Sequence, residues 1–149
     1  MPTPSHLDRL AELDARMVRL LGSGEWLERD RELLRILSMH RGAENPISAR
    51  ALASILRLPE GEYGRRVVTA TIADLVGRGH IPIGARRSKP NGYFLVVSQA
   101  DLDHAIGPLW GEIYALLRRL RVLTSKEQVA KLFGQAMFDF DRPSGKEAA

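Results

Sequence analysis

Apolar residues recur at three- and four-residue steps towards both ends of the chain, a spacing typical of amphipathic helices. We expect a first helix from His6 to Leu21, ended by Gly22-Ser23-Gly24, and a second from Trp26 to His40. Towards the C-terminus we expect a long helix from Gln99 and another from Lys126 to Met137. Helices are therefore expected towards both ends of the chain.

Two shorter helices are expected in the middle of the chain. Ser48 is a suitable N-cap for a helix over Ala49–Arg57, and a second helix is expected from Arg65 to about Arg78. The segment Leu58–Gly64 between them is either a turn or a turn plus an early start of the second helix. The residues expected to face inward are Leu52, Ile55 and Leu56 in the first of these helices and Val68, Ile72, Leu75 and Val76 in the second.

A β-hairpin is expected next. The segments Ile81–Ile83 and Gly92–Val97 are rich in β-branched and aromatic residues, and turn-forming residues lie between them. Cationic residues in that connection need no packing partners, so we expect them at the tip. The polar residues of the expected tip are Arg86, Arg87, Lys89 and Asn91.

The segment from Ile47 to Val97 resembles the winged helix-turn-helix superfamily, particularly its compact prokaryotic and phage-type members. The resemblance rests on an Ile-Ser-x-x-x-Leu-Ala entry, a Val-x-x-x-Ile-x-x-Leu-x-x-x-Gly helix, an Ile-Pro-Ile strand and a Gly-Tyr-Phe-Leu strand after the basic loop. It implies a mostly α fold with a small β-hairpin wing, in which a winged helix-turn-helix core carries N- and C-terminal helical extensions. It also implies double-stranded DNA as a partner and a role in transcription regulation.

This resemblance divides the chain into four segments. Residues 1–29 form an N-terminal amphipathic helix, as an arm or a packing helix, and residues 30–98 form the winged helix-turn-helix. Residues 99–137 form a C-terminal helical extension, and residues 138–149 a flexible tail. One departure from the family pattern is the extended turn at Pro59–Gly64, which places two carboxylates near the start of the expected recognition helix. That helix either starts earlier than in the family or is displaced.

The positive charge lies in the same segment as the resemblance. The chain has a net charge of +4, and residues 30–99 carry eleven Lys or Arg against six Asp or Glu. Such local charge attracts polyanions without specifying a sequence, although an arginine-rich surface can also serve solubility alone.

The resemblance and the helical periodicity together indicate which side chains would meet DNA. Outward arginines of the Arg65–Arg78 helix would read guanine in the major groove, and the basic loop would hold phosphates or enter a minor groove. The alternatives are that Arg65 and Arg66 are solvated or pair with Glu60 and Glu62, that the loop is a solubilising turn, and that Ser48 is only a cap. The expected DNA-binding residues are Ser48, Arg50, Tyr63, Arg65, Arg66, Thr69, Ala70, Arg86, Arg87, Lys89 and Asn91.

No feature of the sequence assembles an active site. The chain has no cysteine, which excludes disulfides and thiolate zinc sites, and its four histidines lack the spacing of a helical metal motif. We therefore expect no enzyme, no cofactor and no metal. We also expect no membrane span and no secretory signal, and hence a cytoplasmic protein.

The helix from Gln99 carries apolar residues with seven-residue periodicity, interrupted at Pro108. This seam either packs against the first helix or pairs with a second copy, and we expect a homodimer because two symmetric reading heads raise affinity by avidity. The alternative function is an adaptor whose apolar helical arms bind a transcription or replication complex. The expected dimerisation residues are Leu109, Ile113, Leu116, Leu120 and Leu123.

Overall fold

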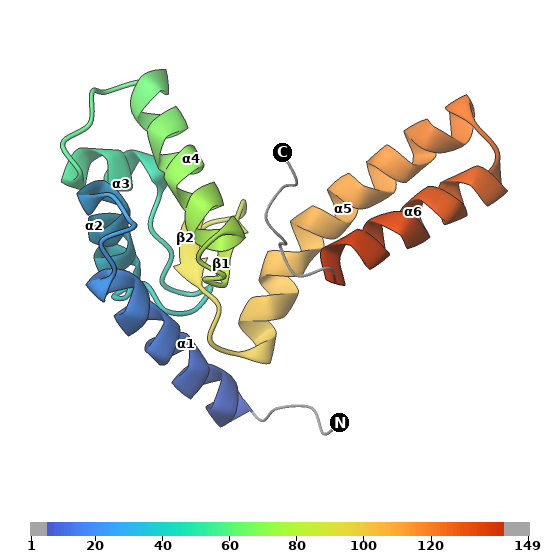
Figure 1. Ribbon diagram of the computed structural model, residues 1–149. Coiled ribbons are helices and arrows are strands. Elements are labelled where there is room, and N and C mark those ends of the chain that lie inside the picture. Colours follow the sequence, from blue (N-terminus) through green and yellow to red (C-terminus); the bar gives the residue numbers. More distant parts are fainter. Residues whose placement is uncertain (1–5, 142–149) are drawn as a thin grey trace. The chain divides into compact units, whose positions relative to one another are not determined.

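The computed structural model describes residues 6–141, with side chains from Leu10 to Asp139. The chain divides at Gly107–Pro108 into two compact units, here called the N-terminal unit and the C-terminal unit. As predicted, the described part is mostly helical with one small antiparallel hairpin (Figure 1). Its elements are α1 (His6–Gly22), α2 (Glu28–Leu37), α3 (Ala49–Ile55), α4 (Glu62–Gly77), β1 (Ile83–Arg86), β2 (Gly92–Leu95), α5 (Gln99–Leu123) and α6 (Lys126–Asp141).

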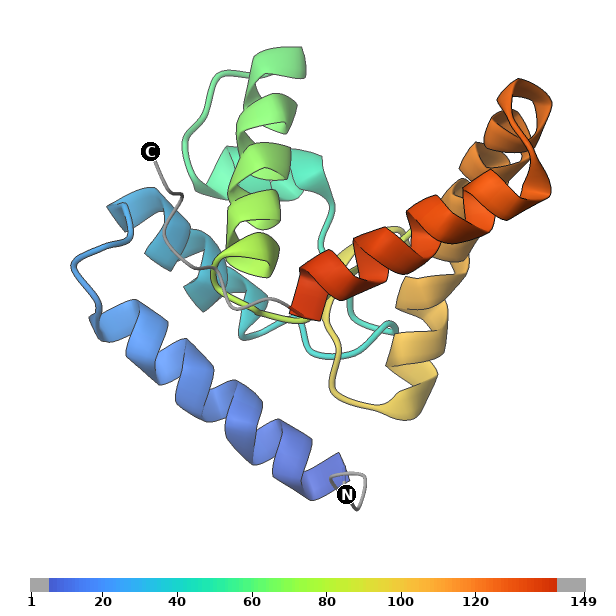
Figure 2. The same ribbon diagram turned by 45° about the vertical axis from the view of Figure 1, so that its right-hand side comes forward.

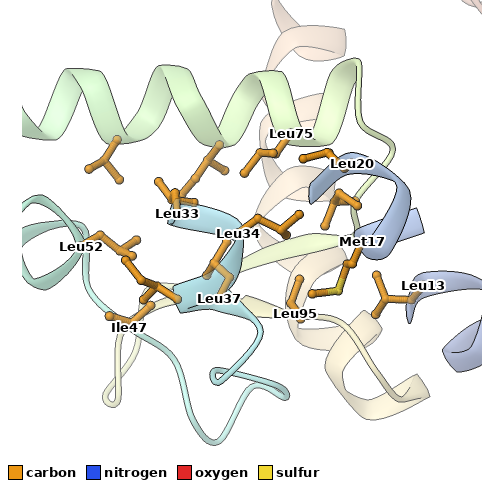
Figure 3. Packing of buried hydrophobic residues seen from close by; sticks show 14 of the residues in the cluster. Leu13, Met17, Leu20, Leu33, Leu34, Leu37, Ile47, Leu52, Leu75 and Leu95 are labelled. Carbon is orange, nitrogen blue, oxygen red and sulfur yellow. The ribbon is translucent and has the colours of Figure 1, made fainter. Parts of the chain in front are cut away.

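The core of the N-terminal unit gathers side chains from α1 to α4 and from the hairpin (Figure 3). The apolar stripe of α1 is buried in it, so α1 is a packing helix. Each fully buried leucine contributes about 2 kcal/mol relative to an exposed one. The labelled members of this core are Leu13, Met17, Leu20, Leu33, Leu34, Leu37, Ile47, Leu52, Leu75 and Leu95.

Helix α2 is shorter than the predicted Trp26–His40. The carboxylate of Asp30 accepts the N–H of Leu27 at 3.1 Å, which fixes the helix start there. At the other end the N–H of His40 donates to the Leu37 carbonyl at 2.8 Å, a tighter turn that ends the helix. Trp26 therefore precedes α2, and the guanidinium of Arg78 lies 4.4 Å from its ring centroid.

Helix α3 ends two residues earlier than predicted. Helix α4 begins at Glu62, which is the early start that the sequence left open for Leu58–Gly64. The N–H of Leu58 donates to the Ala53 carbonyl at 2.9 Å, and Arg57 adopts a left-handed φ of 57°. These features form a Schellman ending, which stops α3 and turns the chain towards α4.

The inward faces of α3 and α4 are narrower than predicted. Leu52, Val68, Ile72 and Leu75 are buried as expected. Ile55 and Val76 were expected inward, but they are 53% and 42% exposed. The prediction was wrong because Ile55 is the last residue of α3 and Val76 lies at the edge of the buried face of α4.

The hairpin begins later than predicted. Residue Ile83 pairs with Leu95 and Arg86 pairs with Gly92, so the connecting turn is 87–91. The peptide bond before Pro90 is cis. Arg86 is consequently the last residue of β1 and not part of the turn.

A third backbone segment joins the hairpin just before α3. Ile47 and Tyr93 exchange two backbone hydrogen bonds of 2.8 and 2.7 Å. Gly92 has a φ of 140°, and a Cβ there would lie 2.3 Å from the Ile47 oxygen. Glycine at position 92 thus permits the contact that positions the start of α3.

The loop between α2 and Ile47 is held by one buried carboxylate. Asp101, in the first turn of α5, accepts the N–H of Ala43 at 2.9 Å and the N–H of Val97 at 3.0 Å. Burial alone would raise the pKa of the Asp101 carboxyl, but these donors and Ser98 outweigh it and hold the pKa below its ordinary value. Ser98 itself caps α5, as its hydroxyl accepts the Asp101 N–H at 3.1 Å.

The C-terminal unit consists of the part of α5 from Pro108 onward and of α6. The two helices run back alongside each other in both views (Figures 1 and 2). Helix α6 extends to Asp141, so the predicted tail over residues 138–149 is helical at least through 141. The remainder of that predicted tail, 142–149, lies outside the described residues. Among residues 6–141, no helix is both long enough and apolar enough to cross a membrane.

We expect Asp101→Asn to lower the free energy of unfolding by about 2 kcal/mol at pH 7, because the amide has only one acceptor oxygen for two backbone donors. Since the folded pKa is lowered, this stabilisation is present above the unfolded carboxyl pKa of about 4 and is lost as the pH falls through the folded value. Urea unfolding of the parent protein and of Asp101→Asn, from neutral to acidic pH, measures the difference between their free energies of unfolding. We expect this difference to narrow below about pH 4.

The matched control is Asp103→Asn, which removes an exposed carboxylate on the same helix. Its effect should stay within about 0.5 kcal/mol at every pH. If the difference in free energy of unfolding between the parent protein and Asp101→Asn stays constant across the acidic range, the ionised Asp101 carboxylate does not hold the loop.

Candidate nucleic-acid interface

The outer face of α4 is a continuous exposed strip. Tyr63 is 63% exposed, and the side chain of Arg66 is 76% exposed. Ala70 and Ala73 continue the strip at helical spacing and are exposed as well. Because these residues are small, a partner can approach the α4 backbone closely along the middle of the helix.

Arg50 and Arg65 line a single cleft between α3, the following turn and α4. The structure therefore brings together two predicted residues from different helices. Both arginines are exposed, while Glu60 lines the same cleft. The cations outnumber the carboxylate, so the cleft carries an excess of positive charge. The remaining lining residues are Ala53, Ser54, Leu58 and Gly61.

The extended turn before α4 is packed closely against the helix. Gly64 is buried, and a Cβ there would lie 2.4 Å from the Pro59 carbonyl oxygen. This packing sets the helix start at Glu62, whose carboxylate lies 3.7 Å from the Arg66 guanidinium. Both side chains are more than three-quarters exposed, so this ion pair is weak and readily exchanged for another anion.

Two predicted hydroxyl contacts are already used within the protein. The Ser48 oxygen accepts the Ala51 N–H at 3.1 Å, which confirms its role as the cap of α3. The Thr69 hydroxyl donates to the Arg65 carbonyl at 2.9 Å. The hydroxyl proton of Thr69 is therefore already used within α4.

Arg86 does not lie at an exposed tip, and that prediction was wrong. Its side chain is only 16% exposed and lies 3.3 Å from the Glu44 carboxylate. The guanidinium donates to the Ala43 carbonyl at 2.9 Å. The short turn brings Arg86 into β1, where its side chain reaches back to the α2–α3 loop. Its main role is thus to hold that loop.

The other three loop residues occupy the turn as predicted. Arg87, Lys89 and Asn91 are exposed in the segment that joins β1 to β2. Two cations on a five-residue turn can meet phosphate oxygens.

Sequence reasoning missed two further arginines. Arg57 is exposed at the left-handed end of α3, and Arg78 stacks on Trp26 beyond the end of α4. The left-handed residue carries no signal in the sequence, because glycine or asparagine is the usual choice there. The stacking of Arg78 depends on a tertiary contact between segments 52 positions apart.

No group of histidine, aspartate and glutamate side chains in the described region could hold a metal ion. No family model, curated protein or solved structure matches the chain.

We expect Arg86→Ala to lower the free energy of unfolding by about 1–3 kcal/mol, because it leaves the buried Ala43 carbonyl without its charged donor. The control is Lys89→Ala in the exposed turn, which should change stability by less than about 0.5 kcal/mol. Urea unfolding at pH 7 compares the two, and equal effects would show that Arg86 does not hold the loop.

Proposed function

We propose that this protein binds double-stranded DNA as a winged-helix protein and acts as a small transcriptional regulator. The observation that carries the proposal is the order α2, paired segment at Ile47, α3, α4, β1 and β2 within one core. A helix pair followed by a hairpin with a cationic turn is the order on which the resemblance to winged helices rests. In this proposal α4 is the recognition helix and the β1–β2 turn is the wing.

The outer face of α4 suits the major groove. The helix presents Arg66 near its start and small residues behind it, so it can enter a groove while the guanidinium reaches a base edge. A bidentate contact of Arg66 with guanine is the most common specific pairing of this kind. Binding would replace the weak Glu62 pair by a stronger one.

Arg50 and Arg65 suit the phosphates that flank the groove. They come from α3 and α4 and face one cleft, so one phosphate can be held from both helices. Glu60 at this cleft opposes binding, which favours a moderate affinity for each protomer. A homodimer would offset this through two linked contacts.

The second candidate function is an adaptor that binds a protein of a transcription or replication complex. It is favoured by the exposed apolar side chains of the C-terminal unit, such as Leu116 and Leu123, which are 56% and 81% exposed. An adaptor would bind its partner through these residues and be indifferent to the cations of the turn.

The DNA proposal is tested by fluorescence anisotropy of a labelled random duplex at low and at physiological salt. We expect log affinity to fall linearly with log salt, because bound cations release counterions. Arg87→Ala/Lys89→Ala should weaken binding about tenfold for all sequences and reduce the salt slope by roughly 2. Arg86 is left intact in this variant because its loss would also loosen the fold.

The matched control is Arg19→Ala/Arg29→Ala, which removes two exposed charges from α1 and α2. It should bind within about twofold of the parent protein, since long-range charge effects are screened at physiological salt. An equal loss of affinity in both variants would show that the turn acts only through the net charge of the protein. Absence of binding at low salt would overturn the DNA proposal and favour the adaptor.

We expect Arg66→Ala to relax base preference at one or two positions, with a loss of about 1–3 kcal/mol on a selected site and little change on random DNA. Selection from a random duplex pool, followed by binding to the selected site, measures both quantities. Arg65→Ala is the comparison, since a phosphate contact weakens binding to both duplexes alike. If Arg66→Ala leaves the base preference unchanged, α4 is not the recognition helix.

A further inference from the structure

The C-terminal unit leaves most of its large apolar side chains in contact with solvent. Helix α5 exposes Leu109, Leu116 and Leu123 by 59%, 56% and 81%, and α6 exposes Phe133 and Met137 by 45% and 52%. Of the described side chains from Pro108 to Asp139, only Val129 is buried. We call this unit the helical hairpin. Two helices alone cannot enclose a core, so its apolar surface requires further helices.

The seven-residue seam of α5 is split by the fold of the helical hairpin. Ile113 and Leu120 are half-buried, whereas Leu109, Leu116 and Leu123 remain exposed. The three exposed leucines are spaced seven residues apart and lie on one line along the helix. This line of leucines is the part of α5 that α6 leaves exposed.

The exposed apolar area is large enough for a specific interface. Ten large apolar side chains of the helical hairpin are exposed by 45% or more. At about 200 Å² each, they expose on the order of 1,000 Å² per chain. Covering about half of this in each of two copies would bury on the order of 1,000 Å² in total, the lower bound for a biological interface.

The charges of the helical hairpin identify a second copy as the partner and set its direction. The end at which α5 meets α6 carries an excess of positive charge, and Glu112 and Asp139 lie towards the other end. Parallel copies would place cations against cations, whereas antiparallel copies place each positive end beside a negative one. The cations of the positive end are Arg118, Arg119, Arg121, Lys126 and Lys131.

We propose that a second copy of this chain covers the helical hairpin, with the two α5 helices antiparallel about a twofold axis at Leu116. Leu109 of one copy then lies opposite Leu123 of the other. Glu112 then lies close to the partner's Arg119, because both residues flank the line of leucines on the same side of α5. The four helices enclose the apolar faces that each hairpin leaves open. The proposal specifies the homodimer of the proposed function, but it does not depend on DNA binding.

The experiment uses cysteine cross-linking in the full chain, which has no cysteine of its own. Three single variants, Leu109→Cys, Leu116→Cys and Leu123→Cys, are oxidised separately and in mixtures without DNA. In the antiparallel arrangement only Leu116→Cys links to itself, while Leu109→Cys and Leu123→Cys link to each other when mixed. In a parallel arrangement all three would link to themselves, and the proposal would be overturned.

Light scattering of the parent protein over a range of concentrations accompanies the cross-linking. We expect a dimer mass, and at least a tenfold weaker dimer in Leu116→Glu with unchanged helical circular dichroism. If Leu116→Glu loses helix, the cross-linking pattern of the cysteine variants still decides the arrangement. A monomer at all concentrations would overturn the proposal and leave a different protein as the occupant. Loss of DNA binding with an intact cross-linking pattern would instead sink the proposed function alone.

Discussion

The carboxylate of Asp101 is the contact on which the N-terminal unit depends. It joins the start of α5 to the α2–α3 loop by accepting the N–H of Ala43, a residue that is 1% exposed. The carbonyl of the same Ala43 accepts from Arg86 of β1. One peptide segment is thus held by an anion on one side and a cation on the other. Charged partners make each of these hydrogen bonds stronger than a neutral one, and their burial makes each costly to lose.

This anchoring fixes the geometry of the candidate interface. Shortly after Ala43 the chain reaches Ile47, which pairs with Tyr93, and then Ser48, which caps α3. The position of Arg50 therefore follows from contacts made by β1, β2 and α5, and not from α3 alone. A seven-residue helix is too short to be stable by itself, so its placement must come from such tertiary contacts. The proposed phosphate site at Arg50 and Arg65 depends on residues that never touch it.

The elements could be predicted from the sequence because helical periodicity and turn formers are local signals. The Ser48 cap, the burial of Val68, Ile72 and Leu75 in α4, and the presence of a hairpin follow from such patterns. Arg86 could not be placed in this way. Its position depends on where the strands begin to pair, and a shift of a few residues moved it from the tip to a half-buried bond with Ala43. For Asp101, the acceptance of an N–H from a residue 58 positions away has no local signal in the sequence.

The start of α4 shows how the extended turn changes the proposed recognition helix. The close approach of Gly64 to Pro59 lets the helix begin at Glu62, so a carboxylate occupies the first turn beside Arg66. That carboxylate is favourable for the helix dipole and unfavourable for a phosphate. In free protein the exposed pair costs little to break, and a guanine offers Arg66 two acceptors in place of one carboxylate contact. Such an arrangement would penalise non-specific binding through Glu62 while retaining the base contact. In the proposed function, this extended turn would then favour sequence selectivity over affinity, and a dimer would restore the affinity.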